Sequence, residues 1–166
     1  MERLWAAWRL NYVTDEKPAA DDCPFCGLEE PDPVTDRTRH VLYRGTHSVA
    51  LLNRYPYTNG HVLVLPFVHC EALDDLTDEV AHDLHETLMR TVKVLRVSYQ
   101  PDGLNLGMNM GSAAGAGIAA HLHYHALPRW SGDTNFMPVI GDTKVLPETL
   151  DMTWEKLRTS FEAIGS

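Results

Sequence analysis

The sequence predicts an α+β domain, in which short strands and two helices share one core. Three apolar runs with strand character are followed by a long amphipathic helix, two more alternating segments and a last helix. The length of 166 residues fits a single domain, 1–166, with an N-terminal arm (1–35), a core (36–130) and a C-terminal loop and helix (131–166). A domain of this size buries roughly 70% of its unfolded surface, so it needs no disulfides to hold its core.

The first half of the core is predicted to hold three short strands, at 41–43, 48–53 and 61–65. Each is an apolar run bounded by glycine, proline or polar turn residues, and the short connection at Gly45 predicts a hairpin. Pro66 is expected to end the third strand, because it cannot donate to a ladder. The preceding residues, 28–39, are rich in acids and prolines and are predicted to form a loop.

The second half is predicted to contain a long helix within 70–100. Thr77 is a good N-cap, apolar residues recur every three or four positions after it, and a proline stands just beyond the helix end. A strand is predicted at 104–111, where glycines allow close approach, and a loop of small residues follows at 112–117. The last helix is predicted at 147–164, where apolar residues again share one face.

Three histidines alternate with apolar residues in the stretch His121-Leu-His123-Tyr-His125. Alternation with period two predicts a strand on which the three imidazoles share one face, and Pro128 is expected to end it. An imidazole near neutral pH can attack an electrophile, transfer a proton or bind a metal. The pattern leaves open a structural role, a metal site made by the three histidines alone, and catalysis with one histidine shared with a metal. It favours catalysis.

Two of the three cysteines form the motif Cys23-x-x-Cys26, which is typical of half a metal site or of a redox pair. A redox pair needs a βαβ context, and none surrounds the motif. A tetrahedral zinc site needs two more sulfur or nitrogen ligands, for which Cys70 is one candidate. Disulfides are not expected, because the chain is expected to be cytoplasmic.

The chain is acidic, with a formal net charge of -9 at pH 7. This argues against a general nucleic-acid binder, which needs a basic face. No apolar run reaches the length of a membrane span and the first residues lack the apolar core of a signal peptide, so a cytoplasmic protein without membrane contact is expected. An anionic substrate would need local attraction in this acidic chain, from histidines, Arg129, Lys144 or main-chain amides.

The motif His-x-His-x-His followed by two apolar residues resembles the signature of the histidine triad family of nucleotide hydrolases and transferases. The continuation Pro128-Arg129-Trp130 and Gly132-Asp133-Thr134-Asn135-Phe136 is similar to its diadenosine tetraphosphate phosphorylase branch. The resemblance runs from about Arg3 to about Leu150. It implies a five-stranded antiparallel sheet that continues edge to edge across a homodimer, with adenine nucleotides and phosphate as the partners.

For the three histidines, this resemblance implies a two-step nucleotidyl transfer. His123, the middle histidine, is expected to attack the α-phosphorus and to form a nucleotidyl-histidine. His125 is expected to contact the phosphate oxygens, and His121 to bind zinc or to orient His123 through the backbone. Further substrate contacts are expected at Asn53, Asn109, Gly115, Gly117, Arg129 and Lys144.

Several of these residues have a second interpretation. Asn53 suits a ribose diol, because an amide both donates and accepts, but it can also cap a turn. The 112–117 loop can bring amides to an oxyanion, or serve only as a flexible turn. Gly117 stands where many relatives carry a serine that looks like a phosphate contact, so that contact must come from the backbone or be lost. Lys144 can meet a distal phosphate or remain a solvated loop lysine.

The resemblance also implies which residues complete the cysteine pair. In zinc-bearing relatives the partners look like the histidines that stand here at His69 and His121, so Cys23, Cys26, His69 and His121 are expected to bind a structural zinc. Some members of the phosphorylase branch lack the cysteines. No carboxylate cluster for magnesium is evident, so magnesium is not expected to be required.

Phosphorolysis of a dinucleoside polyphosphate, such as diadenosine tetraphosphate, to ADP and ATP is the expected activity. The alternatives are hydrolysis of dinucleoside polyphosphates or nucleoside phosphoramidates, and a nucleotide-binding sensor with little turnover. An intact triad argues against the sensor, because binding alone does not need a nucleophile.

Overall fold

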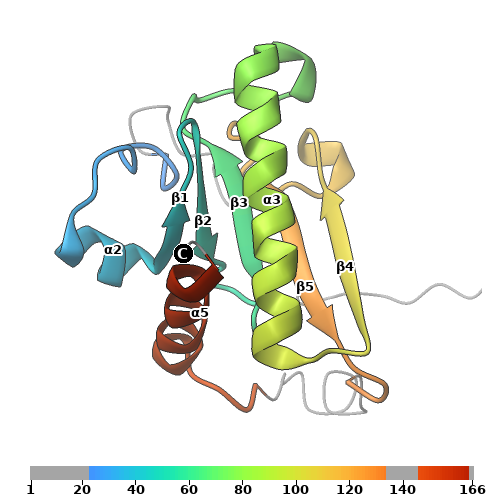
Figure 1. Cartoon of the computed structure of the whole chain (residues 1–166). Coiled ribbons are helices and arrows are strands. Elements are labelled where there is room, and N and C mark those ends of the chain that lie inside the picture. Colours follow the sequence, from blue (N-terminus) through green and yellow to red (C-terminus); the bar gives the residue numbers. More distant parts are fainter. Residues whose placement is uncertain (1–22, 134–145, 165–166) are drawn as a thin grey trace, which may run out of the picture.

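A five-stranded antiparallel sheet, in the order β1-β2-β3-β5-β4, is the centre of the fold and confirms the predicted α+β class (Figure 1). The computed structural model describes residues 23–133 and 146–164, so the first 22 residues of the predicted N-terminal arm, and the predicted contact of Lys144, lie outside the described residues. The strands are β1 (Val41–Arg44), β2 (Ser48–Leu52), β3 (Val62–Pro66), β4 (Gly103–Met108) and β5 (Tyr124–Arg129). The helices are α2 (Pro33–Arg39), α3 (Asp78–Tyr99) and α5 (Leu150–Ile164), with short 3-10 turns η3 (Leu73–Asp75) and η4 (Ser112–Ala114).

The two faces of the sheet are covered by different parts of the chain. Helices α3 and α5 pack on one face, where the core joins apolar side chains of β2, β3 and β5 to Leu84, Leu95 and Leu157 (Figure 1). On the other face a second cluster joins Leu63 and Leu65 of β3 to the segment that carries Phe25. Strands β2 and β3 are therefore buried along their whole length, which explains why their sequences are continuous apolar runs and not alternating ones. None of the helices in the described ranges is both long and apolar enough to cross a bilayer.

The loop predicted at 28–39 is partly wrong, because it contains helix α2. The Oδ2 atom of Asp32 accepts from the backbone N–H of Thr35 at 2.8 Å, and Pro33 occupies the first turn, where its missing N–H does no harm. His40 ends the helix in the left-handed conformation, with φ 54°. Local capping chemistry thus outweighs the polar, proline-rich composition that suggested a loop.

The strand that was predicted to start at His121 and to end at Pro128 is displaced. Strand β5 begins only at Tyr124, so His121 and His123 lie in the segment that leads into it. Pro128 lies inside the strand and pairs with a residue of β4, whereas the pairing with β3 ends at Ala126. Proline is tolerated at this position because, beyond Ala126, β5 has no strand to bond with on its β3 side among the described residues.

The start of the long helix and the end of β4 also differ from their predicted positions. The long helix begins at Asp78, capped by the Thr77 side chain, and not near residue 70; the segment before it holds η3. Strand β4 ends at Met108, three residues before the predicted end, because the glycine at 111 has a positive φ of 80° and turns the chain into η4. These differences leave the predicted order of elements unchanged.

Candidate active site and metal centre

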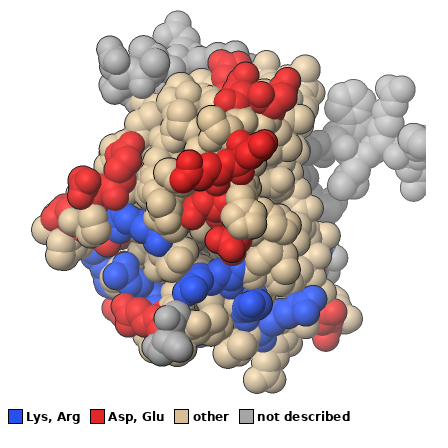
Figure 2. Space-filling model, turned by 45° about the horizontal axis from the view of Figure 1, so that its top comes forward, with Lys and Arg blue, Asp and Glu red and all other residues tan. Residues whose placement is uncertain are grey.

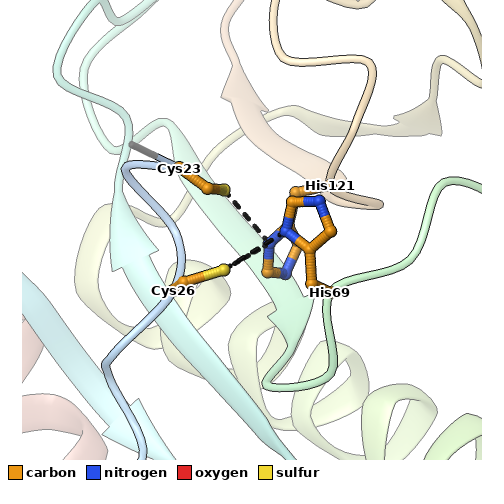
Figure 3. A group of neighbouring side chains, drawn as sticks. All are labelled: Cys23, Cys26, His69 and His121. Atoms are coloured by element: carbon orange, nitrogen blue, oxygen red, sulfur yellow. Dashed lines mark hydrogen bonds between the residues drawn. The ribbon is translucent and has the colours of Figure 1, made fainter. Parts of the chain in front are cut away.

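Four side chains from distant parts of the chain meet at the end of the sheet where β3 stops and the triad segment begins: Cys23, Cys26, His69 and His121 (Figure 3). Their ligand atoms all lie within 4.8 Å of one another. The Sγ atom of Cys23 is 3.4 Å from Nδ1 of His121, and the Sγ atom of Cys26 is 3.2 Å from Nδ1 of His69 and 3.7 Å from Nδ1 of His121. The structure thus brings together the four residues that were predicted from the resemblance.

The shape of this group suits one tetrahedral metal ion. With bonds of about 2.3 Å to sulfur and about 2.0 Å to nitrogen, a tetrahedron has sulfur–nitrogen edges of about 3.5 Å, close to the distances observed here. The Nε2 atom of His121 lies 2.9 Å from the carbonyl of Pro66, which can only accept, so Nε2 carries the proton and the lone pair of Nδ1 faces the thiols. The four residues could therefore hold a metal ion with the tautomer of His121 already set.

The electrostatics of the two thiols also favour a bound metal ion. Burial, followed by the neighbouring thiol of Cys23 and the charge of Glu29, raises the pKa of Cys26 to about 11. Two adjacent thiolates are thus unfavourable without a cation beside them. A divalent ion supplies that charge and deprotonates its thiol ligands, so this group becomes a thiolate pair only together with its metal. Cys70 is a buried free thiol and is not one of the four.

His123 is held in an orientation that exposes one ring nitrogen to reaction. Its Nδ1 donates to the main-chain carbonyl of His121 at 2.8 Å, which leaves Nε2 with a lone pair. The side chain is only 5% exposed, and burial lowers the pKa of His123 below its ordinary value of 6.5, against the raising effect of that hydrogen bond. A neutral imidazole with a fixed tautomer is the form that can attack phosphorus.

His125 and His61 form a second hydrogen-bonded pair beside His123. The rings of His123 and His125 are 4.9 Å apart in a T-shaped arrangement, and Nδ1 of His125 lies 2.9 Å from Nε2 of His61. The backbone N–H of Tyr57 donates to Nδ1 of His61 at 3.1 Å, so the proton of neutral His61 is on Nε2. His61 then donates to His125, whose own proton is left on Nε2. The chain of bonds makes the Nε2 of His125 a donor toward bound substrate.

Asn53 lies just after β2, and its contacts bear on both of its expected roles, the turn cap and the ribose contact. Its Oδ1 accepts from the backbone N–H of Tyr55 at 2.9 Å, which is turn capping. Its Nδ2 lies 3.3 Å from Nδ1 of His61, on the side of the triad. The contact to a ribose stays a prediction, for which the position beside His61 is suitable.

The other predicted contacts are more widely spread. Gly115 adopts a positive φ of 91°, which favours glycine, and it lies with Gly117 in the small-residue loop that precedes the triad. Asn109 lies just after β4, half-buried.

Arg129 is four residues beyond His125, about 13 Å along the strand, and its guanidinium is held by Asp133 at 2.6 and 2.7 Å and by Asn105 at 2.7 Å. Its role as a substrate contact stays a prediction.

Two residues at the site were not predicted. His61 was not assigned a role, although a histidine just after Gly60 at a strand start was a usable signal; it is 1% exposed and bonded to His125. Phe25 stands inside the cysteine motif, and its ring centroid lies 5.3 Å from that of His123 and 5.6 Å from that of His121. Spacing alone could not reveal this, because the partners lie almost a hundred positions away.

Comparison with known proteins places these residues in context. The model of the HIT domain family matches residues 34–132. A protein named AP-4-A phosphorylase from Mycobacterium tuberculosis is 36% identical over 165 residues, which cover 97% of this chain and 85% of the relative. A bis(5'-adenosyl)-triphosphatase from Saccharomyces cerevisiae is 33% identical over 94 residues, 56% of this chain and 45% of the relative.

Among solved structures, a zinc-bound histidine triad family protein from Mycobacterium smegmatis superposes with a TM-score of 0.69 at 26% identity. The match covers 89% of this chain and 98% of the other. That protein holds zinc, and the present chain offers a group of two thiols and two imidazoles whose ligand atoms all lie within 4.8 Å of one another.

Proposed function

The chain belongs to the histidine triad (HIT) family, and on that premise we propose that it transfers a nucleotidyl group from a dinucleoside polyphosphate such as diadenosine tetraphosphate to phosphate. The observation that carries the proposal is the buried His123, whose Nδ1 is bonded to a carbonyl so that Nε2 is the free nucleophile. The similarity to AP-4-A phosphorylase over nearly the whole chain supports the choice of substrate.

In the first step Nε2 of His123 attacks the α-phosphorus. A P–N bond forms, the P–O bond to the rest of the polyphosphate breaks, and its electron pair leaves with the departing ATP. In the second step an oxygen of inorganic phosphate attacks the same phosphorus. The electron pair of the P–N bond returns to Nε2, and the product is ADP. The imidazole is thus first a nucleophile and then a leaving group, which an alkoxide or thiolate would do less readily.

His125 stabilises the charge that develops in both steps. Its Nε2–H, set by the bond from His61, would donate to a phosphate oxygen in the ground state and more strongly in the transition state. The Nδ1 of His61 is itself fixed by Tyr57. This arrangement needs no rearrangement of protons before reaction, which is the source of its catalytic benefit.

We propose zinc as the metal of the Cys23, Cys26, His69 and His121 group. Two cysteines and two histidines are a ligand set typical of structural zinc sites, and zinc has no redox chemistry of its own. With all four positions taken by protein, such an ion holds the fold and has no open site for substrate. No step of the proposed transfer uses it directly.

The proposal predicts a specific pair of products. Diadenosine tetraphosphate with excess phosphate should yield ADP and ATP, because phosphate and not water takes the nucleotidyl group. Chromatographic separation of the products, with and without phosphate, measures this. The hydrolase alternative predicts AMP and ATP at a rate that added phosphate does not change, and that outcome would overturn phosphorolysis.

A homodimer, in the cytoplasm where adenine nucleotides and phosphate occur, is part of the proposal. Strand β4 pairs only with β5 among the described strands, and its outer edge carries Leu106, which is 48% exposed. On the neighbouring α3, Met89 and Val97 are 45% and 65% exposed. An apolar strip beside an open strand edge is suited to pair with its own copy across a two-fold axis.

The charges of α3 favour the same arrangement. Figure 2 shows acidic side chains gathered above basic ones on this side of the molecule. The exposed acids Asp78, Glu79 and Glu86 lie in the first half of α3, and the exposed bases Lys93 and Arg96 lie in the second half. Two copies of the helix that run antiparallel would place each acidic half against the basic half of the other.

Replacement of Leu106 by lysine is expected to convert the dimer into monomers, because a charged side chain on an edge strand opposes pairing. Light scattering after size-exclusion chromatography measures the mass in solution. Met152→Lys is the matched control, since Met152 is 57% exposed on α5, away from the β4 edge. A wild-type monomer, or equal masses for the wild type and Leu106→Lys, would contradict this interface.

The pH dependence of kcat/KM should follow His123. A protonated imidazole cannot attack, and burial lowers the pKa of His123 below 6.5, so the neutral form persists below the pH at which an exposed histidine is half protonated. The rate is therefore expected to be level near pH 7 and to fall only below pH 6.5. Metal content must be measured at each pH, because acid also protonates the metal ligands. An acid limb that begins well above pH 6.5 with metal retained would contradict the assignment.

A further inference from the structure

We propose that Tyr57 is a specificity-determining residue: its exposed ring, held beside His125, stacks on a nucleobase of the bound dinucleotide. The inference deepens the proposed transfer function and rests on it. It assigns to residues 53–61, the loop between β2 and β3, a contact with the substrate that depends on an aromatic face and not on charge.

The ring of Tyr57 lies against the two histidines that bond to each other beside the nucleophile. Its centroid is 4.7 Å from that of His61, at a tilt of 43°, and 5.8 Å from that of His125, where the planes are nearly parallel at 20°. The two imidazoles are themselves 5.1 Å apart. These three distances form a nearly equilateral triangle, so both imidazoles lie in the same direction from the phenol ring. Tyr57 is nevertheless 43% exposed, so the rest of its surface faces solvent.

The chemistry of an exposed tyrosine suits a nucleobase. Covering the buried His61 requires only an apolar side chain of sufficient size, whereas tyrosine adds a π face and is enriched at binding interfaces. Every nucleobase has a π face of its own, and stacking on aromatic side chains is a common way for proteins to hold bases. Such a stack needs no positive charge, which matters in a chain with a formal net charge of -9.

The ring also lies next to the groups that are proposed to hold the rest of the nucleotide. His125 is the proposed donor to the phosphate oxygens, and Asn53 is the predicted ribose contact. The Nδ2 of Asn53 lies 3.3 Å from Nδ1 of His61, the same nitrogen to which the backbone N–H of Tyr57 donates at 3.1 Å. The proposed positions for phosphate, ribose and base thus all border His61, as one continuous nucleotide requires.

Bonds within the loop hold Tyr57 in place before the substrate binds. The Oδ1 of Asn53 accepts from the N–H of Tyr55 at 2.9 Å, and the N–H of Asn53 donates to the carbonyl of His61 at 2.9 Å. The N–H of His61 in turn donates to the carbonyl of Thr58 at 3.3 Å. A ring fixed in advance loses little conformational entropy on binding, which strengthens the stack.

The test compares Tyr57→Leu and Tyr57→Phe with Tyr55→Leu. Leucine still covers His61 but has no π face, whereas phenylalanine keeps the ring. Tyr55 is a matched control, because it is 71% exposed in the same loop and its ring contacts no histidine among the described residues. The substrates are diadenosine tetraphosphate and adenosine tetraphosphate, which have equal numbers of phosphates but differ by one nucleoside. With phosphate as the acceptor, kcat and KM are measured separately for each.

Tyr57→Leu is expected to raise the KM for diadenosine tetraphosphate about tenfold and to keep kcat within a few fold of the wild type, because a lost base stack weakens binding by about this factor. Tyr57→Phe should keep the wild-type KM. If the stacked base belongs to the departing nucleotide, the KM for adenosine tetraphosphate stays unchanged; if it belongs to the reacting nucleoside, KM rises equally for both substrates. A fall in kcat with unchanged KM, a Tyr57→Phe variant as impaired as Tyr57→Leu, or an equal rise of KM in Tyr55→Leu would overturn the proposal.

Failure of the proposed function would give a different result. A wild type that yields AMP in place of ADP refutes phosphorolysis alone, because the comparison of KM values holds for either acceptor. A wild type that converts neither substrate refutes the transfer, and calorimetry with a non-hydrolysable analogue of diadenosine tetraphosphate then decides on Tyr57. Binding about tenfold weaker in Tyr57→Leu than in the wild type and Tyr57→Phe supports the stack. Equal affinities, or no binding by the wild type, overturn it.

Discussion

His123→Ala is expected to lose more than about a hundredfold of the turnover, because removal of a covalent nucleophile leaves only binding and electrostatic effects. The side chain is buried, and its Nδ1 bonds only to a main-chain carbonyl, so the substitution removes the reacting nitrogen without exposing a charge. Binding of a non-hydrolysable dinucleotide analogue, measured by calorimetry, should stay within a few fold of the wild type.

The control for this variant is His85→Ala. His85 is an exposed histidine on α3, on the helix side of the sheet, and its loss should change neither turnover nor binding. If His123→Ala kept more than about a hundredth of the activity, the covalent route would be wrong. If it lost both turnover and binding to the same degree, His123 would be a binding residue and not a nucleophile.

Loss of the metal is expected to have the largest effect on stability. We expect about one zinc per chain in protein purified without a histidine tag, and structural zinc typically contributes on the order of 10 kcal/mol to folding. Because that exceeds much of the stability of an ordinary domain, Cys26→Ser or strong chelation should unfold the chain or lower its Tm by tens of degrees.

Cys70→Ser is the matched control for the metal experiment. Cys70 is also a buried cysteine, but its thiol is outside the four-residue group, and its main-chain carbonyl, which accepts from the N–H of Leu122 at 2.7 Å, is unchanged by the substitution. It should keep its zinc and nearly all of its Tm. A folded, metal-free wild type, or equal losses of Tm in the two cysteine variants, would refute a structural metal at this site.

Much of the fold was predictable because local patterns determine it. The apolar runs at 41–43, 48–53 and 61–65 became β1, β2 and β3 within one or two residues, and the capping residue Thr77 begins α3. The triad itself could be predicted from its alternation. The start of β5 could not, since period-two spacing also continues through the segment before Tyr124. What decides that boundary is β4, which ends at Met108, the partner of Tyr124, and so leaves the residues before Tyr124 without a strand to pair with on that side among the described residues.

The site was predictable in its residue types and less so in its contacts. The four metal-group residues were available only through the family resemblance, because Cys23 and His121 are 98 positions apart. The proton arrangement at His125 depends on His61 and on one backbone N–H of a loop, neither of which has a sequence signature. Sequence patterns give the chemistry of side chains, whereas the tautomers and the shielding of His123 follow from tertiary packing.

The central claim is a nucleotidyl-His123 intermediate, and it can be observed directly. The protein is mixed with diadenosine tetraphosphate in the absence of phosphate and quenched in alkali, where a phosphoramidate is stable, and its peptides are analysed by mass spectrometry. The account predicts that the peptide containing His123 gains the mass of one adenylyl group and that the gain disappears when phosphate is added before the quench. Turnover without any such adduct, together with inversion of configuration at the α-phosphorus, would mean that the acceptor attacks the substrate directly and would contradict the account.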